Sequence, residues 1–170
     1  MITVLQRLDQ VARSLWPFVL SMLLVLASVL PLQLPDFGRI APNFAVMATF
    51  YWAIYRPDLF PGPAAFVLGL WLDLLTGAPL GINALVLLLV HWLTLSQRRF
   101  FQGKSFGVVW WAFALTLSGA MFLFWMLSAA YHLTLIDPSP VVFQLLLTIA
   151  CFPFMTWLLA RTQHVVMRQS

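Results

Sequence analysis

The densest pattern in this sequence runs from Gly69 to Ala84 and reads GLWLDLLTGAPLGINA. Gly69, Asp73 and Gly77 are spaced by four residues, so on a helix they lie on one face. Small residues on a helix face allow a neighbouring helix to approach closely. The glycines and the proline that follow interrupt the helical pattern before Asn83. The stretch therefore predicts a corner made of a helix, a tight turn and a second helix.

Asp73 has two interpretations at this corner. A charged residue in the middle of a membrane span costs about 3 kcal/mol, so it needs polar partners or a function. In the structural interpretation Asp73 holds the corner together by binding turn N–H groups, Asn83 or Arg39. In the functional interpretation it is an intramembrane ligand or proton site. We favour the structural one, because few other polar groups occur within the apolar segments.

The composition around this corner indicates an integral membrane protein. Of the 170 residues, 62% are hydrophobic and only 8% are charged, whereas soluble domains carry roughly 25% charged residues. Such a chain cannot cover a water-facing surface with polar groups, and it has too little charge to be disordered. Its basic residues are scattered singly, which argues against a nucleic-acid partner.

Apolar segments between the charges predict six transmembrane helices packed in one compact all-α domain that covers residues 1–170. Spanning helices need about 20 apolar residues, and the three middle segments are short. A five-span arrangement or a re-entrant segment therefore stays open for that region. The helices are expected at residues 15–35, 42–55, 63–76, 80–95, 107–132 and 141–160, with Pro42 at the start of the second and a kink at Pro153 in the last.

The basic residues predict the orientation of these helices. With six spans, all Lys and Arg residues other than Arg39 fall on one side, which the positive-inside rule assigns to the cytoplasm. Both termini are then cytoplasmic. The residues on that side are Arg7, Arg13, Arg56, Arg98, Arg99, Lys104, Arg161 and Arg168.

The loop from Gln97 to Lys104 is the most cationic one. We expect Arg98, Arg99 and Lys104 to contact anionic lipid headgroups or a cytoplasmic partner, or to serve orientation alone.

Catalytic, cofactor and metal-binding motifs are not found in the sequence. The three histidines, His91, His132 and His164, fall on separate segments, and Cys151 lies in an apolar run. We expect His91 to be packed and hydrogen-bonded to a neighbouring helix, and His132 to lie at the membrane interface. The sequence thus favours a protein that is not an enzyme.

These features resemble the family of MreD, the bacterial rod shape-determining membrane protein. The resemblance rests on the helix that begins near Pro42 and on the pattern G-L-x-x-D-x-x-x-G-x-x-x-G-x-N-A from Gly69 to Ala84. It implies motif positions at Pro42, Gly69, Asp73, Gly77, Gly81 and Asn83. It also implies a fold similar to the substrate-binding S-components of energy-coupling-factor transporters.

The resemblance implies a non-enzymatic subunit of the cell-wall elongation complex in the bacterial inner membrane. The expected partners are MreC, by direct contact, the actin-like MreB filament, the RodA glycosyltransferase and its transpeptidase, a penicillin-binding protein. Such a protein would help couple the filament to peptidoglycan synthesis and rod shape. The alternative is an S-component-like protein that binds a small molecule or a lipid-linked precursor. This alternative needs a polar pocket, which the sequence does not reveal.

Overall fold

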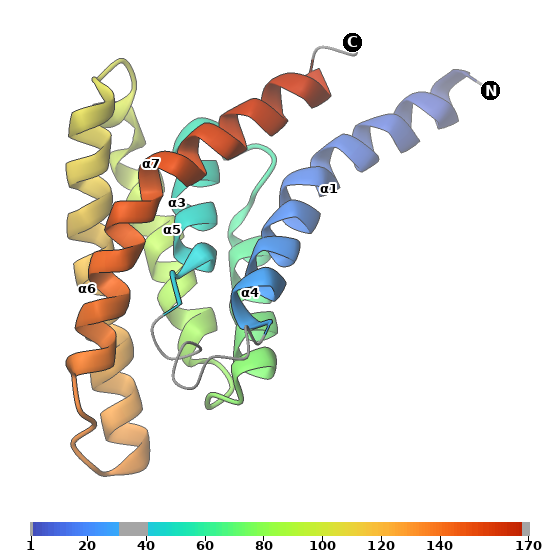
Figure 1. Ribbon diagram of the computed structural model, residues 1–170. Coiled ribbons are helices and arrows are strands. Elements are labelled where there is room, and N and C mark those ends of the chain that lie inside the picture. The colour runs from blue at the N-terminus through green and yellow to red at the C-terminus, as the bar shows by residue number, and fades with distance from the viewer. Residues whose placement is uncertain (1, 31–40, 168–170) are drawn as a thin grey trace.

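The described residues of the computed structural model, 2–30 and 41–167, form six helices that alternate in direction (Figure 1). Arg39, Arg168 and residues 31–35 at the expected end of the first helix lie outside this part of the chain. The helices are α1 (Ile2–Val29), α3 (Phe44–Tyr55), α4 (Gly62–Thr76), α5 (Ile82–Phe101), α6 (Phe106–His132) and α7 (Ser139–Met167).

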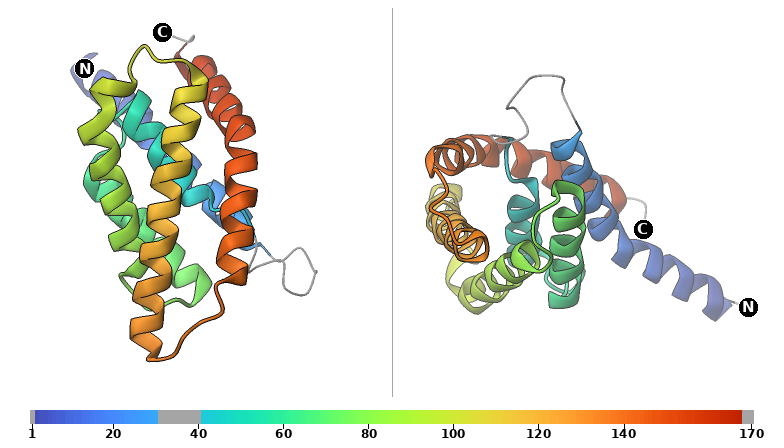
Figure 2. Two further views of the ribbon diagram at one scale, coloured as in Figure 1. Left: turned by 90° about the vertical axis from the view of Figure 1, so that its left-hand side faces the viewer. Right: turned by 90° about the horizontal axis from the view of Figure 1, so that it is seen from below.

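Helix α3 is the centre of the bundle, and α1, α4, α5 and α7 all contact it (Figure 2). Asn43 caps its N-terminus, because the Asn43 side chain accepts a hydrogen bond from the backbone N–H of Val46 at 3.2 Å. All ten residues from Ala45 to Ile54 are buried. The helix begins two residues after Pro42, which precedes the helix instead of opening it.

An aromatic cluster joins this central helix to α6 and α7. The rings of Phe113 in α6 and Phe152 in α7 stack with centroids 3.9 Å apart, and Phe50 of α3 meets both rings edge-on. Edge-to-face and stacked aromatic pairs add specific attraction to the apolar burial. Helix α6 lies between α5 and α7 (Figure 2).

In the described part of the chain, three helices are long and apolar enough to cross a membrane: α1, α6 and α7. Helices α3 and α4 are apolar but have 12 and 15 residues. At 1.5 Å per residue they measure about 18 and 22 Å, less than the roughly 30 Å hydrocarbon core. The short α3 is surrounded by its neighbours, so it does not need to match the lipid thickness by itself.

Three helices extend beyond the expected bounds, because a charged residue ends an apolar window without ending a helix. Helix α1 begins at Ile2 and not at residue 15, and Arg13 and Asp9 form an i,i+4 ion pair at 2.9 Å along this extension. Helix α5 continues to Phe101, so Gln97 and both following arginines are helical and not in a loop.

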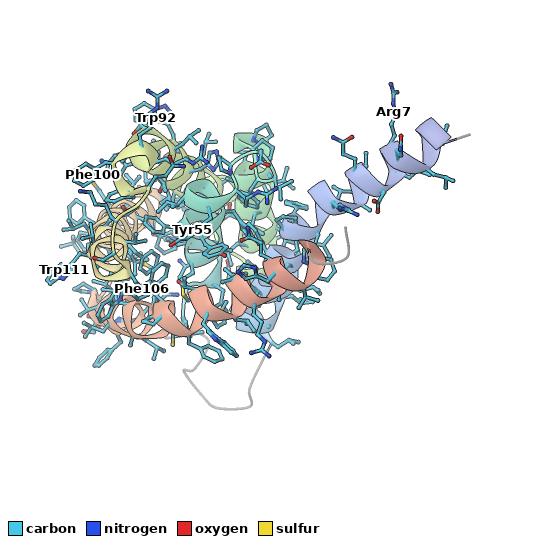
Figure 3. The ribbon with its side chains drawn as sticks, turned by 90° about the horizontal axis from the view of Figure 1, so that it is seen from above. Arg7, Tyr55, Trp92, Phe100, Phe106 and Trp111 are labelled. Atoms are coloured by element: carbon cyan, nitrogen blue, oxygen red, sulfur yellow. The ribbon has the colours of Figure 1, made fainter. Side chains whose placement is uncertain are left out.

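Helix α7 runs from residue 139 to 167 and changes direction along its length, with Pro153 inside it (Figure 1). The first part of α1, which includes Arg7, projects away from the bundle (Figure 3).

Candidate functional site

The corner between α4 and α5 is held by the carboxylate of Asp73, which is fully buried. One carboxylate oxygen, Oδ2, accepts a hydrogen bond from the backbone N–H of Gly81 at 2.9 Å. The other, Oδ1, accepts from the backbone N–H of Asn83 at 3.2 Å and from Asn83 Nδ2 at 2.8 Å. Asp73 therefore caps the start of α5 from the neighbouring helix, where the first N–H groups have no partner within the helix.

These contacts are of the kind that the structural interpretation expects for Asp73. Its partners are two turn and helix N–H groups and the amide of Asn83. Among the described residues Asp73 makes no ion pair. The N-terminus of a helix carries a partial positive charge, so an acidic group is favourable there.

Two glycines of the motif have different structural roles. At Gly69 a β-carbon would stand 2.3 Å from the Cα of Ala84, so only glycine permits this approach of α4 to α5. Gly77 ends α4 with φ +67°, and a β-carbon there would meet nothing within 4 Å. The expectation that Gly77 allows close helix packing is therefore wrong. It is needed for a left-handed backbone.

A cavity of about 470 Å³ lies beside this corner, and all six described helices contribute to its wall. It is found at the end of the bundle where α1 and α4 end and where α3, α5 and α7 begin. Polar side chains in its lining are Ser28, Asn43, Thr76, Asn83 and Gln144, and the remaining lining includes Pro42, Leu72, Val86, Met121 and Phe124.

Sequence reasoning missed this cavity because its polar residues are far apart in the chain. Gln144 Nε2 donates a hydrogen bond to the carbonyl of Ala41 at 3.0 Å, across 103 positions. Thr148 Oγ1 accepts from the backbone N–H of Asn43 at 3.0 Å. The one local signal is Asn43 as a helix cap, and nothing in the sequence places it beside Gln144.

In the cationic segment from Gln97 to Lys104, Arg98 makes a structural contact, whereas Arg99 and Lys104 are exposed. Arg98 Nε donates to the carbonyl of Ile54 at 3.0 Å and so joins α5 to the end of α3. Arg99 is exposed, and the ammonium of Lys104 lies 5.4 Å from the centre of the Phe100 ring. Phe100 and Trp111 point outward from the bundle (Figure 3).

The histidines do not come together, and no cluster of His, Cys, Asp and Glu suited to a metal occurs among the described residues. His91 is buried as expected, with its ring 6.3 Å from that of Phe60. Its Nδ1 has no hydrogen-bond partner in the described part of the chain, so the expected hydrogen bond is not formed at this atom. His132 is exposed next to Tyr131.

Fold and site together define a class, that of small helical membrane proteins built from apolar helices around a buried central one. The chain belongs to the family of the rod shape-determining protein MreD, whose family model matches residues 9–162. Membership gives it a role in rod shape determination and a place in the Rod complex. Searches of curated proteins and of solved structures gave no significant match.

Proposed function

We propose that this protein is a non-enzymatic membrane subunit that binds MreC and couples the MreB filament to the wall synthases. The match to the MreD family over residues 9–162 is the observation that carries the proposal. In the same proposal RodA and its transpeptidase partner belong to the complex. The bundle spans the inner membrane with all six helices, in an arrangement similar to the S-components.

The orientation in this proposal has both termini in the cytoplasm. The seven Lys and Arg residues of the described chain support it, because they all lie toward one end of the bundle. This is the end at which α1 begins, α3 and α5 end, and α7 ends (Figure 1). The positive-inside rule assigns such an end to the cytoplasm. The cavity is then on the opposite, extracytoplasmic side.

The surface available to a transmembrane partner is the outer face of the three long helices. Leu23 in α1, Phe122 in α6 and Phe154 in α7 are all more than half exposed. Between helices in a membrane, van der Waals packing supplies the attraction, because lipid tails are as apolar as the side chains. A partner helix therefore needs a surface of this kind.

Photo-crosslinking in native membranes tests the proposal directly. A photoreactive amino acid is placed at Leu23, Phe122 or Phe154, and at the buried Phe50 as a matched control. We expect a crosslink to MreC from at least one outer position and none from Phe50. A mild-detergent pull-down with mass spectrometry of proteins and lipids should recover MreC and the synthases. If neither experiment recovers an elongation protein, the scaffold proposal fails.

In the cationic segment, Arg99 and Lys104 are the residues to which we assign a binding role. Both are exposed, whereas Arg98 is engaged with Ile54. We expect Arg99 and Lys104 to contact anionic headgroups or a cytoplasmic partner. If the paired Arg99→Gln and Lys104→Gln substitutions leave both lipid and partner recovery unchanged, these charges act in orientation alone.

A further inference from the structure

Three side-chain amides on three different segments line the cavity beside the α4–α5 corner: Asn43, Asn83 and Gln144. Each amide has one end held by the fold. Asn83 donates from Nδ2 to Asp73, and Gln144 donates from Nε2 to the carbonyl of Ala41. Asn43 accepts from the N–H of Val46 through Oδ1. Their orientations are therefore set before any ligand arrives, which lowers the entropic cost of binding.

The opposite end of each amide has no hydrogen-bond partner in the described chain. This leaves two acceptors, Asn83 Oδ1 and Gln144 Oε1, and one donor, Asn43 Nδ2. Asn83 is only 7% exposed. A polar ligand group in the cavity would give each of these three atoms a hydrogen-bond partner.

The described lining carries no Lys, Arg, Asp, Glu or His. Among the described residues, the carboxylate next to this lining is that of Asp73, and it is occupied by Gly81 and Asn83. Among the described lining residues, a charged ligand would meet no opposite charge in exchange for the hydration that it loses. A neutral ligand loses less and can satisfy both the donor and the acceptors.

The rest of the wall is apolar and includes Leu72, Val86, Met121 and Phe124. The volume of about 470 Å³ is typical of small-molecule sites, which are mostly apolar with a few well-placed polar groups. We propose that this cavity binds an uncharged ligand that has hydroxyl or amide groups at one end and an apolar body. This ligand site is separate from the binding of protein partners in the proposed function. Its ligand enters either from the lipid or from solution.

The test uses the full chain in nanodiscs and native mass spectrometry, with matched probes that differ by one phosphate. The lipid pair is monooleoylglycerol and its phosphate ester, lysophosphatidate. The soluble pair is methyl glucoside and its phosphate ester. We expect saturable one-to-one binding of a neutral probe and no competition from its charged partner. Saturation by monooleoylglycerol indicates a lipid source, and saturation by methyl glucoside alone indicates a soluble one.

Two variants address the site by separate means. Gln144→Leu removes one acceptor together with the hydrogen bond to the carbonyl of Ala41, and Ala120→Phe places a large ring in the cavity that Ala120 lines. Gln144→Leu should weaken binding by about tenfold, the value of about one hydrogen bond, and Ala120→Phe should weaken it at least as much because its ring occupies the ligand volume. Gly119→Ala is the control on the same helix, because a β-carbon there meets nothing within 4 Å.

Either of two results overturns the proposal. One is that no neutral probe binds saturably to protein that retains its unfolding temperature. The other is that binding persists equally for the phosphate esters or for both cavity variants. Neither result bears on MreC crosslinking, so failure of the site and failure of the scaffold are distinguishable.

Discussion

Gly69 lies against Ala84 so closely that a β-carbon at position 69 would be 2.3 Å from the Cα of Ala84 and 2.6 Å from its nitrogen. Both atoms belong to backbone, which cannot rotate away as a side chain can. Helices α4 and α5 therefore meet at main-chain distance at this point. The same two helices are also joined by the hydrogen bonds between Asp73, four residues after Gly69, and Asn83, which directly precedes Ala84.

Gly69→Ala should destabilise the bundle by about 3 kcal/mol, because the two helices must separate to admit one methyl group. The measurement is the unfolding temperature in a fixed detergent, with Gly119→Ala as the control. The control glycine is exposed on α6 with open space around it, so we expect no loss there. Equal effects of the two substitutions would contradict the contact.

Asp73→Asn and Asp73→Leu should both lower stability, and leucine should do so more. All three partners of Asp73 are N–H donors. Asparagine keeps one oxygen for Asn83 but turns an NH₂ group toward the N–H of Gly81, at a cost of about 2 kcal/mol. Leucine accepts no hydrogen bond and leaves all three donors unpaired, at a cost of about 4 kcal/mol.

Folded yield and unfolding temperature distinguish the two interpretations of Asp73. A structural role predicts that the folded yield and the unfolding temperature both decrease from wild type to Asp73→Asn to Asp73→Leu. A proton or ligand site predicts intact folding of both variants with loss of rod shape in complemented cells. Wild-type stability and wild-type shape in both variants would contradict both interpretations.

Gly77→Val should cost about 2 kcal/mol, because the left-handed conformation at φ +67° is unfavourable for a β-branched residue. Gly77→Asn should be milder, since asparagine adopts this conformation more readily than other residues. The turn is exposed and a β-carbon at this position meets nothing within 4 Å, so neither side chain is forced against a neighbour. Thermal unfolding of both should therefore separate backbone strain from packing, and a reversed order would argue against strain.

Arg98→Gln should lower the unfolding temperature, whereas Arg99→Gln should not. The Arg98 side chain donates to the carbonyl of Ile54, and hydrogen bonds from charged groups contribute about 2 kcal/mol. Arg99 is its exposed neighbour with the same charge. The pair therefore separates a specific contact from general electrostatics, and equal stability of both variants would show that the contact to Ile54 contributes little.

Much of the fold could be predicted from the sequence because apolar segments and turn residues are local signals. The corner from Gly69 to Asn83 is the clearest case, since glycine spacing and one carboxylate predict both the helix and the turn. Helix ends were less predictable. Arg7 and Arg13 mark the edge of an apolar window, yet α1 continues through them because arginine is a good helix former.

By itself the sequence determined the apolar helices, the corner held around Asp73 and the end of the bundle at which the basic residues gather. Only the tertiary structure decided which helix is central and which side chains share the cavity. In a membrane protein the core and the lipid are equally apolar, so hydropathy does not distinguish an inward face from an outward one. Asn43, Asn83 and Gln144 are single amides in three separate segments, and packing of all six described helices places them around one cavity.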